Sequence, residues 1–169
     1  MTKIIAGTGH RPEKLGGYNE SVFTRLTALC KASLQKMQAT EVLSGMALGF
    51  DLALATAAVE LQIPLIAAVP FREQDDKWNE SDRERYEYLL FQTKKIVYVD
   101  EVKDYAINQP GYSPQKIHKR NEYMVDNCHE VLALFDGIAS GTGNCVKYAE
   151  SLNKPIFNVW NSWVKYRSF

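Results

Sequence analysis

The chain has 169 residues, of which 46% are hydrophobic and 24% charged, a composition typical of a folded protein with one core. Lys and Arg number 20, as do Asp and Glu, so the net charge gives no reason to expect direct binding to nucleic acid or to an anionic membrane. The three cysteines are far apart and odd in number, which argues against a disulfide framework. Without a membrane-length apolar run or a secretory signal, we expect a cytoplasmic protein with one domain over residues 1–169.

Short apolar runs predict the strands, and apolar residues at helical spacing predict the helices. The first half of the chain is predicted to contain a strand at 3–6, a helix at 19–38, a strand at 41–44, a helix at 51–61, a strand at 64–69 and a highly charged helix at 72–95. The second half is predicted to contain a strand at 96–99, a long loop at 101–114, a helix at 115–127, a strand at 131–135, a helix at 144–152 and a strand at 155–160.

Strands that alternate with helices at this spacing predict βαβ units and therefore a parallel sheet. The strands are continuously apolar, as expected for strands that helices cover on both faces. The predicted fold class is α/β, a Rossmann-like three-layer αβα sandwich with a mostly parallel sheet of about six strands.

Glycine-containing turns are predicted after three of these strands. They are Gly7-Thr8-Gly9, Gly45-Met46-Ala47-Leu48-Gly49 and Ser140-Gly141-Thr142-Gly143. A strand, a glycine-rich turn and a helix together attract an anion, because free backbone N–H groups and the helix dipole point at it. The alternative for the last turn is an ordinary N-cap at Thr142 or Asn144. All three turns should meet at the carboxyl edge of the sheet, so we expect one shared crevice.

Two basic residues follow the first of these turns. Arg11 is suited to clamp a phosphate, and His10 to donate a hydrogen bond or move a proton, although both have an alternative as ordinary surface and turn residues. The dinucleotide fingerprint fails, because Pro12 replaces its third glycine and Ser44 stands where an acidic residue would hold a ribose. No Gly-Lys-Ser/Thr occurs and the histidines lack zinc-ligand spacing, so neither a resident cofactor nor a metal site is indicated.

Five further residues are weighed, and three of them, Asp51, Trp78 and Arg120, are kept as candidates for weaker reasons. Asp51 is either an N-cap or a ribose contact, and Trp78 either stacks on a base or packs in the core. His118 and Arg120 cannot share a helix face, and we choose Arg120 as the ligand contact. Cys145 is interpreted as a small buried residue rather than a nucleophile.

Several motifs in this order resemble one known family. The motifs are Gly7-Thr8-Gly9-His10-Arg11-Pro12, Ser44 to Asp51, Pro70-Phe71 with Gln74 and Trp78, and Arg120-Asn121-x-x-Met124-Val125-Asp126 through Ser140-Gly141-Thr142. They resemble the YpsA-like branch of the SLOG superfamily, which includes LOG nucleotide phosphoribohydrolases and DprA-type DNA-processing proteins, and the similarity covers nearly the whole chain. The resemblance implies a Rossmann-like domain that binds a nucleotide or nucleotide-derived ligand, often as a homodimer.

The resemblance to the LOG enzymes is incomplete at the residues that carry their activity. Their Met-His-x-Arg-Lys-x-x-Met segment supplies a catalytic arginine, and here the segment 117–124 keeps the His, the Arg and the final Met. Their Gly-Gly-x-Gly-Thr-x-Glu-Glu loop supplies a catalytic glutamate, but Asn144 and Cys145 occupy the two acidic positions here. Cleavage of an N-glycosidic bond needs a carboxylate near the sugar, so this difference favours binding over hydrolysis.

The leading hypothesis is therefore a protein that binds a nucleotide or nucleotide-derived signal at the strand ends. The candidate ligand-binding residues are Gly7, Gly9, His10, Arg11, Ser44, Gly45, Gly49, Asp51, Trp78, Arg120, Ser140, Gly141, Thr142 and Asn144. One alternative is a nucleoside monophosphate N-glycosidase in which Arg120 positions the substrate and Asp51 is the acid. Another is a partner-binding regulatory protein with a vestigial pocket.

Overall fold

The computed structural model describes residues 1–166. The first half contains β1 (Ile4–Gly9), a 3-10 helix η1 (Pro12–Lys14), α1 (Glu20–Lys36), β2 (Glu41–Ser44), α2 (Phe50–Glu60), β3 (Leu65–Val69) and α3 (Glu80–Phe91). The second half contains β4 (Lys95–Tyr98), two 3-10 helices, η2 (Val99–Glu101) and η3 (Lys103–Tyr105), and then α4 (Pro114–Asp126), β5 (Glu130–Leu134), α5 (Gly141–Ser151), β6 (Ile156–Asn158) and α6 (Trp160–Tyr166).

The strands form one six-stranded sheet in the order β4-β3-β2-β1-β5-β6. Neighbouring strands are parallel throughout, with Ile5 of β1 opposite Val42 of β2 on one side and opposite Glu130 of β5 on the other. The predicted Rossmann-like α/β fold is confirmed. The order changes direction at β1, because β2, β3 and β4 extend to one side and β5 and β6 to the other.

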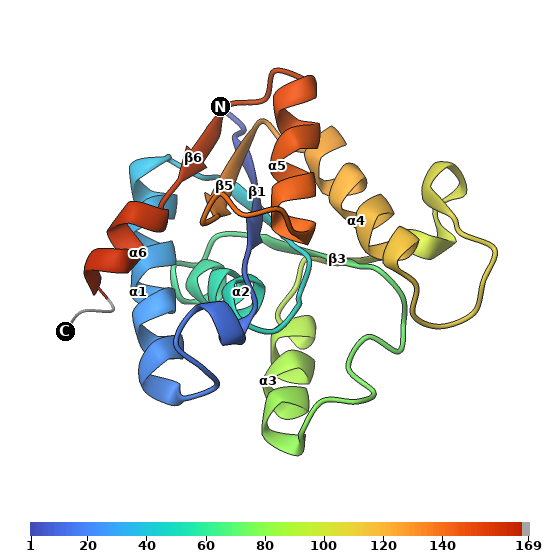
Figure 1. The fold of residues 1–169 in the computed structure, drawn as a ribbon, viewed down its shortest axis with the longest axis horizontal. Coiled ribbons are helices and arrows are strands. Elements are labelled where there is room, and N and C mark those ends of the chain that lie inside the picture. Colours follow the sequence, from blue (N-terminus) through green and yellow to red (C-terminus); the bar gives the residue numbers. More distant parts are fainter. Residues whose placement is uncertain (167–169) are drawn as a thin grey trace.

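Helices cover both faces of the sheet and enclose two apolar cores (Figure 1). Because successive strand residues point to opposite faces, Ile5 belongs to the core under α1, α2 and α6, whereas Ala6 belongs to the core under α4 and α5. Within residues 1–166, no helix has the length and apolar character required to cross a bilayer.

The predicted turn at residues 7–9 is wrong, because these residues are the second half of β1. A Cβ on Gly7 would lie 2.1 Å from Cδ2 of Leu54, and one on Gly9 would lie 2.4 Å from Cγ of Phe50. Both glycines therefore allow α2 to pack directly against the strand. In the sequence, glycines required for close helix packing cannot be distinguished from glycines of a turn, which explains the wrong prediction.

Two predicted helix boundaries also differ from the structure. Residues 72–79 form turns rather than helix, and α3 begins only after Asn79, whose Oδ1 accepts a hydrogen bond from the backbone N–H of Asp82 at 2.8 Å. In α5 the N-cap is Ser140 rather than Thr142 or Asn144, so Gly141 to Gly143 form the first helical turn and not a loop.

The end of the described chain contains a helix that the sequence interpretation missed. The strand predicted at 155–160 ends at Asn158, whose Oδ1 accepts a hydrogen bond from the N–H of Trp160 and so starts α6. The predicted long loop at 101–114 contains the end of η2 and all of η3. The single-domain prediction stays a prediction, and its last three residues lie outside the described part.

Candidate functional site

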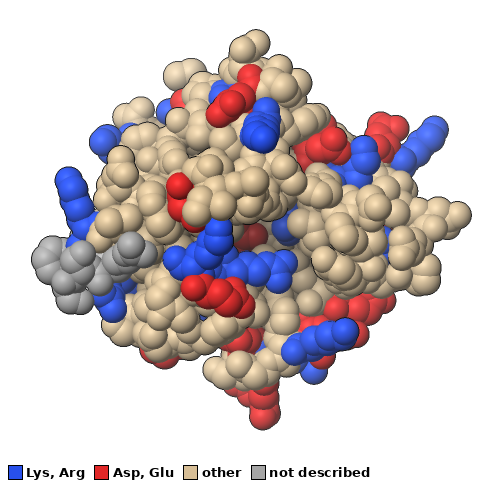
Figure 2. Space-filling view, in the orientation of Figure 1, with Lys and Arg blue, Asp and Glu red and all other residues tan. Residues whose placement is uncertain are grey.

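A cavity of about 360 Å³ opens outside the carboxyl end of β1, where the strand order changes direction. Figure 2 shows basic side chains gathered around a hollow near the centre of this face. Four segments line the cavity: Gly7, Thr8, Gly9, His10, Arg11, Glu13 and Lys14; Ala47 and Asp51; Ile117, Arg120, Asn121 and Met124; and Ser140, Gly141 and Thr142. Its size and position are typical of ligand sites in open α/β sheets.

The start of α5 gives this cavity an anion-binding character. The Oγ of Ser140 accepts from the N–H of Gly143, and its carbonyl accepts from the N–H of Asn144. The N–H groups of Gly141 and Thr142 at the helix start have no such partner among the described residues, and they carry the positive end of the helix dipole. Thr142 is 9% exposed, and its hydroxyl forms no hydrogen bond within residues 1–166.

Two basic side chains lie at the rim of the cavity. Lys14 pairs with Asp136 at 3.2 Å. The side chain of Arg11 is exposed and forms no ion pair or hydrogen bond within the described residues. A guanidinium that forms no close ion pair, beside a helix N-terminus, is well suited to a phosphate.

Asp51 and Arg120 form a buried pair of charged groups in the cavity wall. Nη1 of Arg120 donates to the carbonyl of Gly45 at 2.6 Å, and Oδ2 of Asp51 accepts from the N–H of Ala47 at 3.3 Å. A Cβ on Gly45 would lie 2.3 Å from Nη1 of Arg120 and 2.9 Å from Oδ2 of Asp51, so glycine is required there. Burial raises the pKa of Asp51 although the Arg120 guanidinium opposes the shift, and burial lowers the pKa of Arg120.

Four side chains of the cavity keep polar atoms that nothing in the described chain satisfies. Asp51, Arg120, Asn121 and Thr142 are 6%, 4%, 7% and 9% exposed. Among residues 1–166, fully buried side-chain polar atoms without a partner occur only in Asp100 and Trp163. The free atoms of the four side chains therefore retain accessible surface, and that surface lies in the cavity that they line. Buried polar groups normally have partners, so this arrangement is typical of a polar ligand site.

His10 has a more structural position than the sequence suggested. Its Nε2 lies 3.0 Å from both the backbone nitrogen and Oδ1 of Asp136, and its ring contacts the rings of Phe135 and Trp160. Burial lowers the pKa of His10, which favours the neutral ring. His10 therefore joins the end of β1 to the end of β5 beside the cavity.

The structure brings nine of the fourteen candidate residues together in the cavity and leaves five outside its lining: Ser44, Gly45, Gly49, Trp78 and Asn144. The Ser44 hydroxyl is used inside the protein, where it donates to the carbonyl of Asp51. Gly49 has a φ of 91° and, as the N-cap of α2, passes close to the backbone of His10. Trp78 packs edge-on against Tyr86, and Asn144 is exposed on α5.

The cavity also contains residues that the sequence interpretation did not select. They are Thr8, Glu13, Lys14, Ala47, Ile117, Asn121 and Met124. The helical spacing of Ile117, Asn121 and Met124 with the chosen Arg120 was a usable signal, since positions three, four and seven apart share one face.

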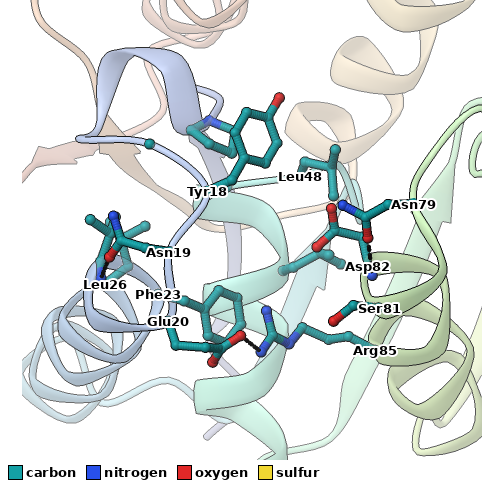
Figure 3. Close-up of a pocket in the computed structure, with 15 residues that line it drawn as sticks. Tyr18, Asn19, Glu20, Phe23, Leu26, Leu48, Asn79, Ser81, Asp82 and Arg85 are labelled. Carbon is teal, nitrogen blue, oxygen red and sulfur yellow. Dashed lines mark hydrogen bonds and ion pairs between the residues drawn. The ribbon is translucent and has the colours of Figure 1, made fainter.

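A second cavity of about 280 Å³ lies between α1, α2 and α3 (Figure 3). Figure 3 shows Arg85 reaching from α3 to Glu20 of α1, and their ion pair measures 2.6 Å. The Arg85 guanidinium also lies 3.7 Å from the ring centre of Phe23. Glu20 and Arg85 of this cavity thus pair with each other, whereas the Arg11 side chain beside β1 forms no ion pair within the described residues.

Neither metal ligation nor thiol chemistry is indicated at these sites. Within residues 1–166, no group of three or more His, Cys, Asp or Glu side chains is placed to hold a metal ion. Cys145 is buried behind the cavity, and burial raises its pKa to about 11, so the thiolate is scarce at neutral pH.

Comparisons with known proteins agree with this architecture. A family model described as the YspA SLOG family matches residues 5–156. The SPbeta prophage-derived protein YoqJ of Bacillus subtilis (strain 168) is 35% identical over 134 residues, which is 75% of this chain and 78% of that protein. A UPF0398 protein of Bacillus pumilus (strain SAFR-032) is 30% identical over 174 residues, covering 93% of this chain and 87% of that protein.

Two solved structures share the fold at low sequence identity. DNA processing protein A from Streptococcus pneumoniae superimposes with a TM-score of 0.65 and 16% identity over 93% of this chain, which spans only 50% of that protein. The molybdenum cofactor binding protein from Rippkaea orientalis gives a TM-score of 0.57 and 15% identity, covering 92% of this chain and 75% of that one.

Proposed function

Since this chain belongs to the YspA SLOG family, we propose that it binds a nucleotide or nucleotide-derived signal in the cavity at the carboxyl end of β1. The observation that carries the proposal is the set of unsatisfied polar atoms on Asp51, Arg120, Asn121 and Thr142, all nearly buried and all in one cavity. Leaving such atoms without partners costs free energy, which a polar ligand would recover.

The charges divide the cavity into regions that fit the parts of a nucleotide. The free N–H groups of Gly141 and Thr142 and the unpaired Arg11 favour a phosphate. The Asp51 carboxylate would repel a phosphate, but its free oxygen can accept a hydrogen bond from a ribose hydroxyl. The molybdenum cofactor binding protein from Rippkaea orientalis and the single-stranded DNA-binding DNA processing protein A from Helicobacter pylori share this fold, which adds general support for a nucleotide-like ligand.

A second candidate function, hydrolysis of the N-glycosidic bond, is favoured by one observation. Burial raises the pKa of Asp51, and a carboxyl group that keeps its proton closer to neutral pH is suited to general acid catalysis. The reaction would consume a nucleotide and water and would release the free base and a sugar phosphate. Asp51 would protonate the leaving base, and Arg120 would hold the substrate.

The test is incubation of the purified protein with AMP, GMP, CMP, UMP, their 3′,5′-cyclic forms and ADP-ribose. Native mass spectrometry of the protein and analysis of the supernatant then separate the two functions. A nucleotide retained intact establishes binding, whereas free base with a sugar phosphate establishes hydrolysis. If no nucleotide is retained or cleaved at millimolar concentration, the proposed function is wrong.

Two substitutions test whether the phosphate binds at Arg11 and the start of α5. Arg11→Ala and Thr142→Val are expected to abolish retention of the nucleotide and to leave the melting temperature of the free protein nearly unchanged, since neither side chain has an internal polar partner. Lys147→Ala is the matched control, because Lys147 is an exposed cation on α5 outside the cavity. Unchanged affinity in both cavity variants would refute the phosphate position.

A further inference from the structure

One wall of the cavity differs from the others in its chemistry. The sides formed by β1, η1 and the start of α2 present Arg11, Lys14 and Asp51. On the α4 side, Arg120 is accompanied by two apolar residues, Ile117 and Met124, and by the uncharged amide of Asn121. Ile117, Asn121 and Met124 are separated by four and three residues on one helix, so they form a continuous strip along α4.

The amide of Asn121 is held in one orientation by its neighbour. Nε of Arg120 donates to Oδ1 of Asn121 at 3.0 Å. A guanidinium has no acceptor, so the atom facing it must be the amide oxygen. The amide nitrogen Nδ2 then points away from Arg120, and it forms no hydrogen bond within residues 1–166. Asn121 is only 7% exposed, so Nδ2 is a nearly buried donor of fixed orientation in the cavity.

The strip suits a flat, uncharged ring with a hydrogen-bond acceptor on its edge. Half-buried Ile117 offers apolar surface to the cavity. Met124 lines the cavity although it is only 1% exposed, and methionine sulfur makes favourable contacts with aromatic rings. Only Nε and Nη1 of Arg120 have partners in the described chain, which leaves Nη2 of this planar cation accessible beside the strip. A carbonyl oxygen or ring nitrogen of a nucleobase would satisfy Nδ2 of Asn121.

We infer that the α4 strip of Ile117, Asn121 and Met124 is the subsite for the heteroaromatic ring of the ligand, and that Asn121 donates a hydrogen bond to an acceptor on the ring's edge. The inference rests on the proposed function, because it assumes that the phosphate lies at the start of α5. It places the ring on α4, and it makes Asn121 a specificity-determining residue.

The test substitutes Asn121→Asp and measures the affinities for AMP, GMP, CMP and UMP and for ribose 5-phosphate by calorimetry. Aspartate keeps the oxygen that Arg120 contacts but replaces the donor Nδ2 with an acceptor. For the nucleotide that the wild type binds most tightly, the ratio of its affinity to that of ribose 5-phosphate is expected to fall about tenfold. The added charge weakens both phosphate ligands, so the ratio isolates the contact with the ring.

His118→Asp is the matched control, because His118 is exposed on the same helix and does not line the cavity. It adds a similar charge and is expected to leave the ratio unchanged. A second variant, Ile117→Ala, leaves the Arg120–Asn121 contact intact and is expected to lower the ratio about threefold, even if Asn121→Asp fails to fold.

The outcomes separate this inference from the proposed function. If the wild type binds none of the nucleotides, the proposed function itself is wrong. If it binds one of them and the ratio is unchanged in both variants, only the position of the ring is wrong. An equal loss of affinity for ribose 5-phosphate and for the nucleotide in Asn121→Asp would show that Asn121 makes no contact with the ring, and it would overturn the inference.

Discussion

Replacing Gly45 with alanine tests the arrangement of the buried charges directly. The new Cβ would lie 2.3 Å from Nη1 and 2.6 Å from Cζ of Arg120, where an ordinary contact needs more than 3.4 Å. The Arg120 guanidinium therefore has to move by about 1 Å, and its 2.6 Å hydrogen bond to the carbonyl of Gly45 lengthens or breaks. The backbone of Gly45 has no positive φ, so the effect comes from this contact and not from strain in the main chain.

Two contributions set the size of the effect on stability. Overpacking of a well-filled interior costs about 1–3 kcal/mol. The loss of a hydrogen bond from a buried charged group costs about 1.5–3 kcal/mol, although relaxation of the side chain recovers part of both. We expect Gly45→Ala to lower the free energy of unfolding by about 2–4 kcal/mol. Nucleotide affinity should fall as well, because Arg120 also holds Asn121.

Gly141→Ala is the control, because it makes the same substitution at a position where the new Cβ contacts no other atom. A Cβ at Gly141 would meet no atom within 4 Å, and the residue is the first of α5, where alanine favours the helix by up to about 1 kcal/mol. Urea unfolding followed by circular dichroism measures both variants against the wild type. A Gly45→Ala protein within about 0.5 kcal/mol of the wild type would refute the close approach of Arg120 to this backbone.

Three further predictions follow from other contacts. Ser140→Ala removes the cap of α5 and is expected to lower the free energy of unfolding by about 1 kcal/mol in the same urea assay, whereas no change would show that the cap is dispensable. Because burial lowers the pKa of His10 below 6.5, the unfolded chain takes up a proton that the folded protein resists, so stability should fall as the pH drops below about 6.5. His10→Gln should flatten that slope in unfolding curves measured from pH 7 to 5, and an unaltered slope would exclude His10 as its source. Asp51→Asn should keep nucleotide binding and remove any release of free base, so an Asp51→Asn protein that still releases base would exclude Asp51 as the acid.

The fold could be predicted from the sequence because its signals are local. Each strand is a short apolar run, and the helices show helical spacing, an alanine- and leucine-rich composition or a run of charge, so alternation alone indicated a parallel sheet. Errors arose where tertiary contacts decide the conformation. A pair of glycines such as Gly7 and Gly9 usually indicates a turn, but here both lie in β1, where α2 packs directly against them. Asn158 starts α6 through one side-chain contact that no periodicity reports.

The candidate site could be predicted only in part for a related reason. The strand ends marked by Arg11, Asp51 and Thr142 do meet, because parallel strands share a carboxyl edge. No sequence signal marks Asn121, because the orientation of its amide is set by a contact with Arg120 that only the three-dimensional structure shows. Trp78 has the aromatic character of a base-stacking residue, but its partner is Tyr86.

The position of β1 between β2 and β5 has a consequence for the order in which the protein forms. β1 and β2 follow one another in the chain, whereas the hydrogen bond from Asp136 to His10 joins residues 126 positions apart. Long-range pairings of this kind carry a larger loop-closure entropy and form late in folding. During synthesis, β1, α1 and β2 emerge well before α5. The cavity is therefore completed only when β5 and α5 have docked, and a ligand bound there stabilises the finished fold but none of its shorter precursors.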